Sequence, residues 1–264
     1  MTDKPLPTEF VQLAFRLTMA SRQAIQPYFR HPVTVDSKPD NSPVTAADRA
    51  AETAMRRLIA QQFPDHGIVG EEEGAHNAEA PFVWVLDPID GTKRFITGNP
   101  LYGTLIALLE GGTPILGVID MPALGERWLG MAERPTLFTD REGTREVKTR
   151  ACPTLAEAAL YSTSPFMFEG PNAPPYGRLT GAVKMPLYGG ECYAYGLLAS
   201  GFVDLVVEAE MKPYDYLSHV PVIEGAGGRI TDWQGRKLGL ESDGRILAAG
   251  DPRCHAAALE LLSQ

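Results

Sequence analysis

The spacing of apolar residues in the first part of the chain predicts two amphipathic helices followed by short strands. Apolar positions recur at helical spacing over residues 8–29, and a second helical stretch covers residues 45–63 and stops before Pro64. The segment between them, residues 31–43, predicts a loop or a short hairpin. Strands are predicted at 66–70 (HGIVG) and 82–86 (FVWVL), as a hairpin at 102–121, and at 127–131 (RWLGM) and 135–139 (PTLFT).

Beyond about residue 150 predicted strands and helices alternate. The strands are expected near 158–164, 182–188, 203–209 and 245–250, and the helices at 192–201, at 214–228 and from Pro252 onward. The alternation favours an α/β protein of layered sheets and helices, antiparallel-rich in its first half and mixed in its second. We therefore expect two units, residues 1–150 and residues 151–264.

Composition and charge narrow the possible function classes. With 44% hydrophobic and 22% charged residues, the chain of 264 residues has the profile of a soluble globular protein. Its formal net charge of −9 disfavours binding to nucleic acid or to anionic membranes, because like charges repel. Three scattered cysteines without a CxxC pair predict neither a disulfide framework nor a zinc site. No secretion signal or membrane span is apparent, so we expect a cytoplasmic protein.

Three acidic segments lie at the ends of predicted strands or at the starts of predicted helices. They are GEEEG (70–74), DPIDGT (87–92) and YDYLS (214–218). Each has an ordinary structural explanation, since Asp-Pro and Asp-Gly form turns and an acid in a first helical turn favours the helix dipole. If the segments converge, however, two carboxylates about 4 Å apart repel by about 4 kcal/mol at an effective dielectric near 20. A convergent cluster therefore predicts a bound cation.

The residue types in this cluster favour Mg²⁺. Hard oxygen ligands without histidine or cysteine select magnesium or a close relative rather than zinc. A tight turn can aim Asp87, Asp90 and the Ile89 carbonyl into one pocket, and a carboxylate shared by two ions fits a two-metal site. Gly91 and Thr92 would begin a helix whose free N–H groups bind phosphate, and the Thr92 hydroxyl could direct a water toward phosphorus.

The same residues carry a resemblance to a known family. GEEEG, WVLDPIDGT and YDYLSHVPVIEGAGG, with SPVTAADRAAE (42–52), resemble in order and separation the signatures of the inositol monophosphatase-like family of Mg²⁺-dependent, lithium-sensitive phosphatases. The resemblance extends from about residue 10 to the C-terminus. The third segment departs from the family, with Tyr214 for Trp and Leu217 for Ala, at positions that we expect only to pack. The family implies a five-layer α/β/α/β/α sandwich, usually assembled as a dimer.

The resemblance also implies roles for individual residues. Glu71 and Thr92 would position the nucleophilic water, and Asp48 would hydrogen-bond Thr92. Thr45 and Asp48 also form an acidic variant of a helix capping box, so a purely structural role for Asp48 stays open. Two or three Mg²⁺ ions would be held by Glu71, Asp87, Asp90, Asp215 and the carbonyl of Ile89.

Within the family, residues 91–112 and 187–208 look most like the histidinol-phosphatase branch, whose substrate carries a primary amine and an imidazole. Glu191 and Glu208 could pair with that cationic end through charge-assisted contacts. A helix-dipole role for Glu191 is the alternative. The residues expected around the substrate are Asp90, Gly91, Thr92, Glu191, Cys192, Tyr193, Glu208 and Asp215.

Four of the residues near these segments have a competing structural explanation. Tyr193 could wall the pocket, but an aromatic residue beside a helix start commonly packs. Lys93 and Arg94 could draw phosphate in, or could simply be solvated. His219 follows Asp215 by one helical turn, and among hard oxygen ligands we expect it to support or pack rather than to bind metal.

The sequence favours hydrolysis of L-histidinol phosphate to L-histidinol and phosphate, a step of histidine biosynthesis, by a homodimer. The nearest rival is an inositol-1-monophosphatase or a broad sugar-phosphate phosphatase that uses the same metals. A nucleotide 3′-phosphatase is disfavoured, because no basic and aromatic cluster is present to bind an adenine bis-phosphate. The rival from another class is a regulatory protein that binds metal and phosphate without turnover, and the intact set of acids with Thr92 argues against it.

Overall fold

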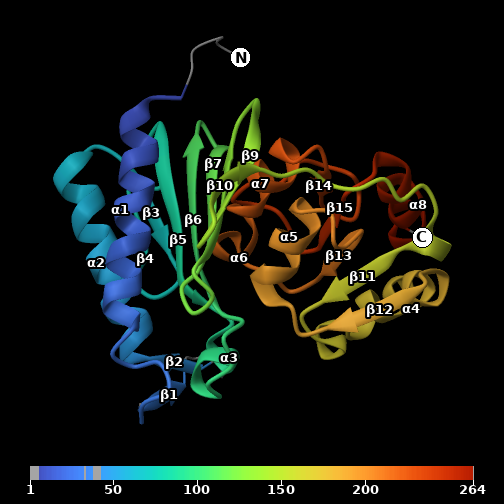
Figure 1. Ribbon diagram of the computed structural model, residues 1–264, viewed down its shortest axis with the longest axis horizontal. Coiled ribbons are helices and arrows are strands. Elements are labelled where there is room, and N and C mark those ends of the chain that lie inside the picture. The colour runs from blue at the N-terminus through green and yellow to red at the C-terminus, as the bar shows by residue number, and fades with distance from the viewer. Residues whose placement is uncertain (1–5, 33, 38–42, 264) are drawn as a thin grey trace.

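A computed structural model describes residues 6–32, 34–37 and 43–263 of the chain. Helices and sheets stack in five layers, with a helical layer on each outer side and a third between two sheets (Figure 1). The five-layer α/β/α/β/α architecture implied by the family resemblance is therefore confirmed.

The first outer layer consists of two long helices, α1 (Thr8–Ile25) and α2 (Ala46–Gln62). Their apolar stripes, which include Leu13 and Met55, pack on one face of the larger sheet. A two-stranded hairpin, β1 (Val35–Ser37) with β2 (Pro43–Thr45), leads into α2, and the loop between its strands lies outside the described residues. The segment for which a loop or a hairpin was predicted is thus a hairpin in its described part.

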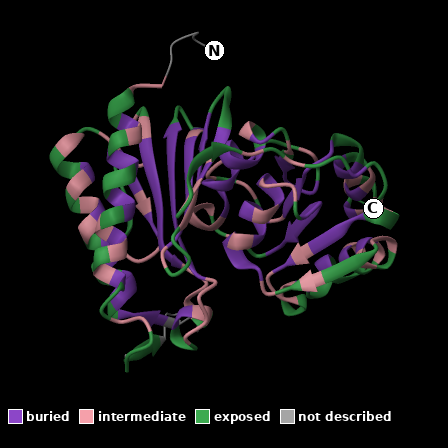
Figure 2. Cartoon of the chain, viewed as in Figure 1, coloured by how far each residue is buried: buried purple, intermediate pink, exposed green. Residues whose placement is uncertain are grey.

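The larger sheet has the strand order β10-β9-β8-β7-β6-β5-β3-β4, in which only β3 and β5 run parallel. Side chains alternate along β5, so that Trp84 faces α1 and α2 whereas Val83 and Val85 face the middle layer. Both faces are covered in the middle of the sheet, and strands β5, β6 and β7 are accordingly buried (Figure 2). The strands are β3 (Gly67–Gly70), β4 (Gly74–His76), β5 (Phe82–Asp90), β6 (Gly103–Glu110), β7 (Thr113–Met121), β8 (Glu126–Met131), β9 (Arg134–Asp140) and β10 (Gly143–Glu146).

The middle layer and the second sheet complete the stack. The middle helices are α5 (Glu191–Ala199), α6 (Pro213–Tyr216) and α7 (His219–Gly225), and a short α3 (Thr92–Ile96) follows β5. The second sheet has the order β12-β11-β13-β15-β14, with strands β11 (Ala159–Ser162), β12 (Met185–Tyr188), β13 (Leu205–Glu208), β14 (Arg229–Thr231) and β15 (Ile246–Ala249). Its outer face is covered by α4 (Ala173–Ala182) and α8 (Pro252–Leu262), and short 3₁₀ turns lie at Leu155–Glu157, Pro165–Met167 and Gly170–Asn172.

Most predicted elements are present, and the main differences have local causes. The predicted helix over 214–228 is two helices, α6 and α7, because Pro221 has no N–H to donate to the carbonyl of Leu217 four residues earlier. The first helix ends at Ile25 and continues as turns, and strand β5 runs on through Asp90. Strands β4, β10 and β14 were not predicted.

The predicted division near residue 150 stays a prediction. The largest core cluster joins side chains from both sides of that boundary, among them Ile119 from the larger sheet and Leu198 and Val206 from the second half. None of the described helices is long and apolar enough to cross a membrane.

Two glycines let the middle layer lie directly on the larger sheet. A Cβ at Gly130 in β8 would stand 2.2 Å from the backbone nitrogen of Val222, and one at Gly117 in β7 would stand 1.9 Å from the carbonyl oxygen of Ser218. The backbone at the start of α7, which follows the end of α6 closely, therefore rests directly on these strands.

The same substitution is expected to have opposite effects at two glycines. Gly130→Ala forces backbone apart and should lower the free energy of unfolding by about 1–3 kcal/mol. Gly177→Ala, in the exposed interior of α4 with nothing within 4 Å of its new Cβ, should raise that free energy by about 0.5–1 kcal/mol. Urea unfolding of both variants measures the difference, and equal effects would contradict the close contact of α7 with β8.

Candidate active site

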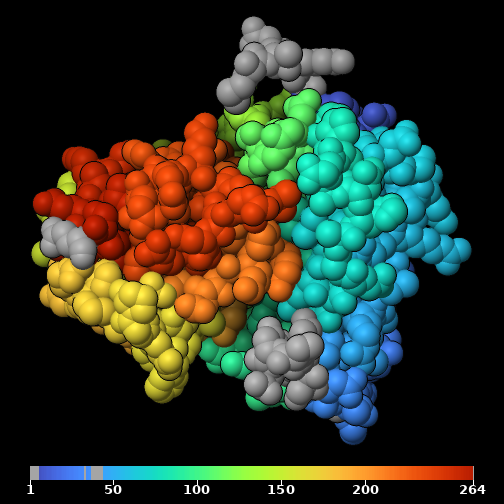
Figure 3. All heavy atoms as spheres, turned by 180° about the vertical axis from the view of Figure 1, so that it is seen from behind, coloured from blue at the N-terminus to red at the C-terminus, as the bar shows by residue number. Residues whose placement is uncertain are grey.

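A cavity of about 300 Å³ opens where the end of β5 meets α3, α5 and α6. Most of the predicted site residues meet here. They come from both halves of the chain, which lie side by side in Figure 3. Asp48, Asp87 and Ile89 are buried next to the cavity and do not line it. The lining residues are Glu71, Asp90, Gly91, Thr92, Lys93, Thr163, Met167, Glu191, Cys192, Tyr195, Glu208, Met211, Asp215 and His219.

An irregularity at the end of β5 sets the directions of its two aspartates. Asp87 pairs with Leu105 and Asp90 with Gly103, so three steps along β5 match two steps along β6. The Ile89 N–H donates to Asp87 Oδ1 at 2.9 Å, which closes a local turn around the extra residue. The predicted tight turn is therefore a bulge within the strand rather than a loop after it.

Backbone groups from the middle layer hold the other oxygens of this cluster. The Cys192 N–H at the start of α5 donates to Asp90 Oδ2 at 2.8 Å, and the Lys212 N–H donates to Asp215 Oδ2 at 2.7 Å. Asp215 thereby caps α6. Helix α5 can come this close because Gly103 has no side chain. A Cβ at this position would stand only 2.5 Å from Cys192 Sγ.

The turn that carries Glu71 is held by a residue that the sequence did not single out. Glu52, buried in α2, accepts hydrogen bonds from the N–H groups of Glu72 at 2.7 Å and Glu73 at 3.0 Å. Arg56 Nε pairs with the same carboxylate at 2.8 Å. The Glu71 N–H donates to the Leu86 carbonyl at 3.2 Å, so the turn is tied to β5 as well.

Burial raises the pKa values of three acids at this site, and neighbouring acids add to the effect at Asp87 and Asp215. Burial raises the pKa of Asp87 most, and the charges of Glu71, Asp90 and Asp215 raise it further. Burial is also the main cause of the raised pKa of Asp90, and the hydrogen bonds with Cys192 oppose it. Burial likewise raises the pKa of Asp215 well above its usual value. Four acids from β3–β4, β5 and α6 thus converge, and their ionised forms repel one another until a cation joins them.

The donor set fits Mg²⁺ because it consists of oxygens alone. Within the described ranges, no group of three His, Cys, Asp or Glu side chains is already placed to hold a metal ion. Backbone N–H groups instead hold one oxygen each of Asp87, Asp90 and Asp215. The assignment of a cation therefore depends on the chemistry of the donors and on their mutual repulsion, not on a closed coordination shell.

Asp48 caps helix α2 and also lies near the Thr92 hydroxyl. The Thr92 hydroxyl donates to the Ile89 carbonyl at 3.1 Å and lies 3.5 Å from Asp48 Oδ1. The other oxygen of Asp48 accepts from the N–H of Thr45 at 2.7 Å and from its hydroxyl at 2.6 Å, in a capping box of α2. The cap is thus present, and the catalytic role of Asp48 stays a prediction.

Gly91, the residue before α3, has the left-handed conformation with φ of 80°. This helix has only five residues, so its contribution to anion binding comes from individual N–H groups rather than from a long dipole. Lys93, exposed at the rim, lines the same cavity.

Two buried glutamates, Glu191 and Glu208, line the cavity and are separate from the acids assigned to metal binding (the metal-type acids Glu71, Asp87, Asp90 and Asp215). Glu208 accepts from Thr163 N–H at 3.0 Å and from Tyr195 hydroxyl at 3.0 Å, and burial raises its pKa to about 7. Glu191 pairs with Arg94, and burial raises the pKa of this carboxyl against the opposing effect of the guanidinium. Thr163 and Tyr195 were not predicted as site residues.

Tyr193 does not line the cavity, contrary to the pocket-wall expectation. Its ring packs on Trp128, with centroids 5.8 Å apart. Successive residues of a helix point about 100° apart, so Cys192 and Tyr195 face the cavity while Tyr193 turns toward the larger sheet. The alternative of simple packing holds for this residue.

His219 is a buried, neutral side chain. Its ring stacks on Tyr195 with centroids 3.9 Å apart, and its Nδ1 lies 3.2 Å from Ser218 Oγ. Burial lowers its pKa to about 3, which makes it a poor proton carrier at neutral pH. Its supporting position agrees with the expectation that it packs rather than binds metal.

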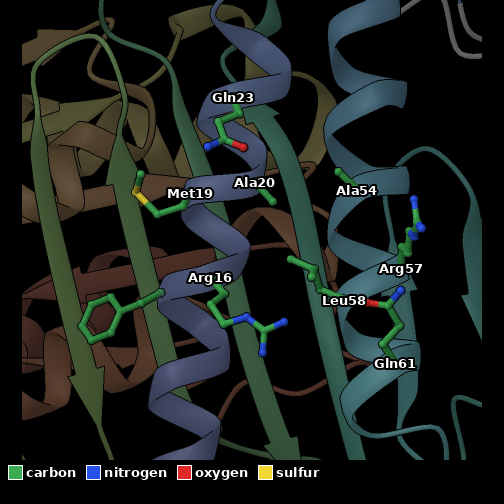
Figure 4. A pocket seen from close by; sticks show the side chains of 9 residues that line it. Arg16, Met19, Ala20, Gln23, Ala54, Arg57, Leu58 and Gln61 are labelled. Atoms are coloured by element: carbon green, nitrogen blue, oxygen red, sulfur yellow. The ribbon is translucent and has the colours of Figure 1, made fainter.

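A larger cavity of about 590 Å³ lies between α1 and α2 (Figure 4). Arg16 and Met19 reach into it from α1, and Arg57 and Leu58 from α2. Its lining contains no acid, cysteine or histidine. The size of a cavity therefore does not identify the active site. The side chains suited to catalysis line the smaller cavity at the end of β5.

The fold and the site define a layered α/β protein in which four acids converge at a small cavity. The sequence profile of the inositol monophosphatase family matches residues 6–264. The chain belongs to the inositol monophosphatase family and is a phosphatase of that family.

Individual relatives agree with this assignment. The chain is 51% identical to the bifunctional phosphatase IMPL2, chloroplastic, of Arabidopsis thaliana, over 96% of this chain and 75% of the relative. It is 36% identical to a histidinol-phosphatase of Chlorobaculum parvum, over 91% of this chain and 92% of that protein. A solved inositol monophosphatase from Zymomonas mobilis superposes with a TM-score of 0.89 at 44% identity, covering 99% of this chain and all of the other. The resemblance to the family and to its histidinol-phosphatase branch is confirmed.

Proposed function

We propose that this phosphatase is Mg²⁺-dependent and hydrolyses L-histidinol phosphate to L-histidinol and phosphate. The observation that carries the substrate assignment is the pair of buried carboxylates, Glu191 and Glu208, in the cavity that Glu71, Asp90 and Asp215 also line. A buried acid needs a partner, and the amine and imidazole of histidinol phosphate supply cationic N–H donors.

The residues of the chain divide the work between metal, water and substrate. Two or three Mg²⁺ ions would be held by Glu71, Asp87, Asp90, Asp215 and the Ile89 carbonyl. Bound there, Mg²⁺ would supply an activated water and neutralise charge on the phosphate. Glu71 and Thr92 would orient the water, and Asp48 would fix the Thr92 hydroxyl that it already approaches to 3.5 Å. The N–H groups at Gly91 and Thr92 would bind phosphate oxygens.

The second candidate is an inositol-1-monophosphatase or a broader sugar-phosphate phosphatase. It is favoured by the 44% identical inositol monophosphatase and by the word bifunctional in the name of the 51% identical relative. It would use the same metal-type acids, and it differs only in what Glu191 and Glu208 contact.

The homodimer and the cytoplasmic location stay predictions. In support of self-association, β12 is an edge strand whose Met185 and Tyr188 are exposed, and Phe166, in the 3₁₀ turn that follows the neighbouring strand β11, is 82% exposed. Edge strands and exposed aromatic residues are common at interfaces between subunits.

Phosphate release from histidinol phosphate and from inositol 1-phosphate, measured side by side with Mg²⁺, tests the substrate. We expect a preference for histidinol phosphate of about a hundredfold in kcat/KM, which is about 2.7 kcal/mol of transition-state discrimination. Glu191→Gln keeps the volume and removes the charge, so it should reduce this preference and leave inositol 1-phosphate turnover intact. Comparable rates for the wild type on both substrates would favour the broader phosphatase instead.

A further inference from the structure

Arg94 and Glu191 form an ion pair at the edge of the cavity. Arg94 lies in α3, directly after the Gly91-Thr92 turn, and Glu191 begins α5, 97 residues further along the chain. Arg94 Nε donates to Glu191 Oε1 at 2.8 Å, and the two side chains are 31% and 9% exposed. The pair therefore joins the phosphate-binding turn to the helix that carries the substrate-facing glutamate.

The backbone around this pair is shaped to admit it. A Cβ at Gly189, where φ is 87°, would stand 2.3 Å from Arg94 Nη2. A Cβ at Gly91, where φ is 80°, would stand 3.3 Å from Glu191 Cγ. Glu191 itself has φ of 43°, a left-handed conformation that is unfavourable for a residue with a side chain. Strain of this kind persists where the surroundings fix it, and it concentrates at ligand sites.

Only one oxygen of Glu191 is used by the pair. Oε1 accepts from Arg94, whereas Oε2 is buried and has no hydrogen-bond partner among the residues that the structure describes. A carboxylate oxygen buried without a donor is costly, so the arrangement is incomplete until a donor arrives. Glu191 lines the cavity, and the missing donor can therefore come from a ligand bound there.

We propose that Arg94 is a positioning residue for substrate selectivity: it anchors Glu191 by Oε1, so that Oε2 accepts a hydrogen bond from a cationic N–H group of the phosphate ester. The proposal rests on the phosphatase function proposed above. The pair carries no net charge, so Glu191 can act as a local acceptor without repelling the phosphate end of the same substrate. The substrate class is a small phosphate monoester with an ammonium or imidazolium group.

The test is a double-mutant cycle with kcat and KM measured separately for histidinol phosphate and inositol 1-phosphate. Arg94→Gln should raise KM for histidinol phosphate by about tenfold or more, the size expected for one charge-assisted hydrogen bond, with kcat changed by less than about threefold. KM for inositol 1-phosphate should change little. Adding Arg94→Gln to Glu191→Gln should have no further effect, because Arg94 acts through Glu191.

Lys93→Gln is the matched control, since it removes the same charge from the neighbouring position on α3. It should leave the ratio between the two substrates unchanged, whatever it does to both rates. Arg94→Lys, which keeps a cationic donor, should recover part of the ratio and guards against a folding defect. Additive effects in the double mutant, or an unchanged ratio in Arg94→Gln, would overturn the proposal. Absence of phosphate release from the wild type would instead overturn the proposed function.

Discussion

Replacing Asp90 by asparagine should abolish phosphate release while the fold remains intact. Asp90 is part of the acid cluster and lines the cavity, and its substitution removes a full negative charge without changing the side-chain volume. Loss of several kcal/mol of metal-dependent stabilisation corresponds to a decrease in kcat/KM on the order of a thousandfold or more. The measurement is kcat/KM at saturating Mg²⁺, with Asp65→Asn, an exposed acid away from the cavity, as control.

The stability of the Asp90→Asn variant separates this explanation from simple unfolding. The carboxamide oxygen can still accept from the Cys192 N–H, and one source of repulsion is gone. In EDTA the variant should therefore melt at the same temperature as the wild type or above it. Mg²⁺ should raise the melting temperature of the wild type, since a ligand at a hundred times its Kd stabilises by about 2.7 kcal/mol, but not that of the variant. Near-normal turnover of the variant at saturating Mg²⁺ would refute the metal assignment.

Glu71→Gln is expected to reduce kcat by about 10²- to 10⁴-fold, the range for loss of a positioned base. Glu71 lies close enough to Asp87 for their side chains to hydrogen-bond, and its charge raises the pKa values of Asp87 and Asp215. It is therefore part of the cluster as well as the residue expected to orient water. Single-turnover measurements at high Mg²⁺ isolate the chemical step from binding.

Glu73→Gln is the control for this prediction, because the two glutamates lie in the same turn. Glu73 is 45% exposed on its side chain and accepts from the Thr53 hydroxyl at 2.6 Å. Its replacement should change kcat by about twofold at most, as for an exposed polar contact. If both substitutions reduced kcat equally, the turn as a whole, and not Glu71, would be responsible.

Sequence patterns predicted the elements of this fold better than their boundaries. Apolar runs and helical periodicity identify strands and helices directly, so β5 to β9 and the two long outer helices were found. The split between α6 and α7 depends on a single missing N–H at Pro221, within an otherwise periodic stretch. Short strands such as β4, whose residues are all exposed, leave no apolar signal. The five layers followed from the family resemblance and not from periodicity.

The same limit applies to the site. Asp87, Asp90 and Thr92 lie within one short segment, DPIDGT, so their pattern could be read directly. Glu52 supports the Glu71 turn from a different helix, and that contact depends on tertiary packing. Thr163 and Tyr195 reach Glu208 only because β11 and β13 are paired and α5 covers them, and no local spacing encodes this.

Phosphate release from histidinol phosphate, with Mg²⁺ present, after EDTA and after Mg²⁺ is restored, tests the central claim most directly. The convergence of Glu71, Asp87, Asp90 and Asp215 predicts rapid release with Mg²⁺, a loss of at least about a thousandfold in EDTA, and full recovery when the ion returns. Release that continues at an undiminished rate in EDTA would contradict the assignment of these four acids to a catalytic cation.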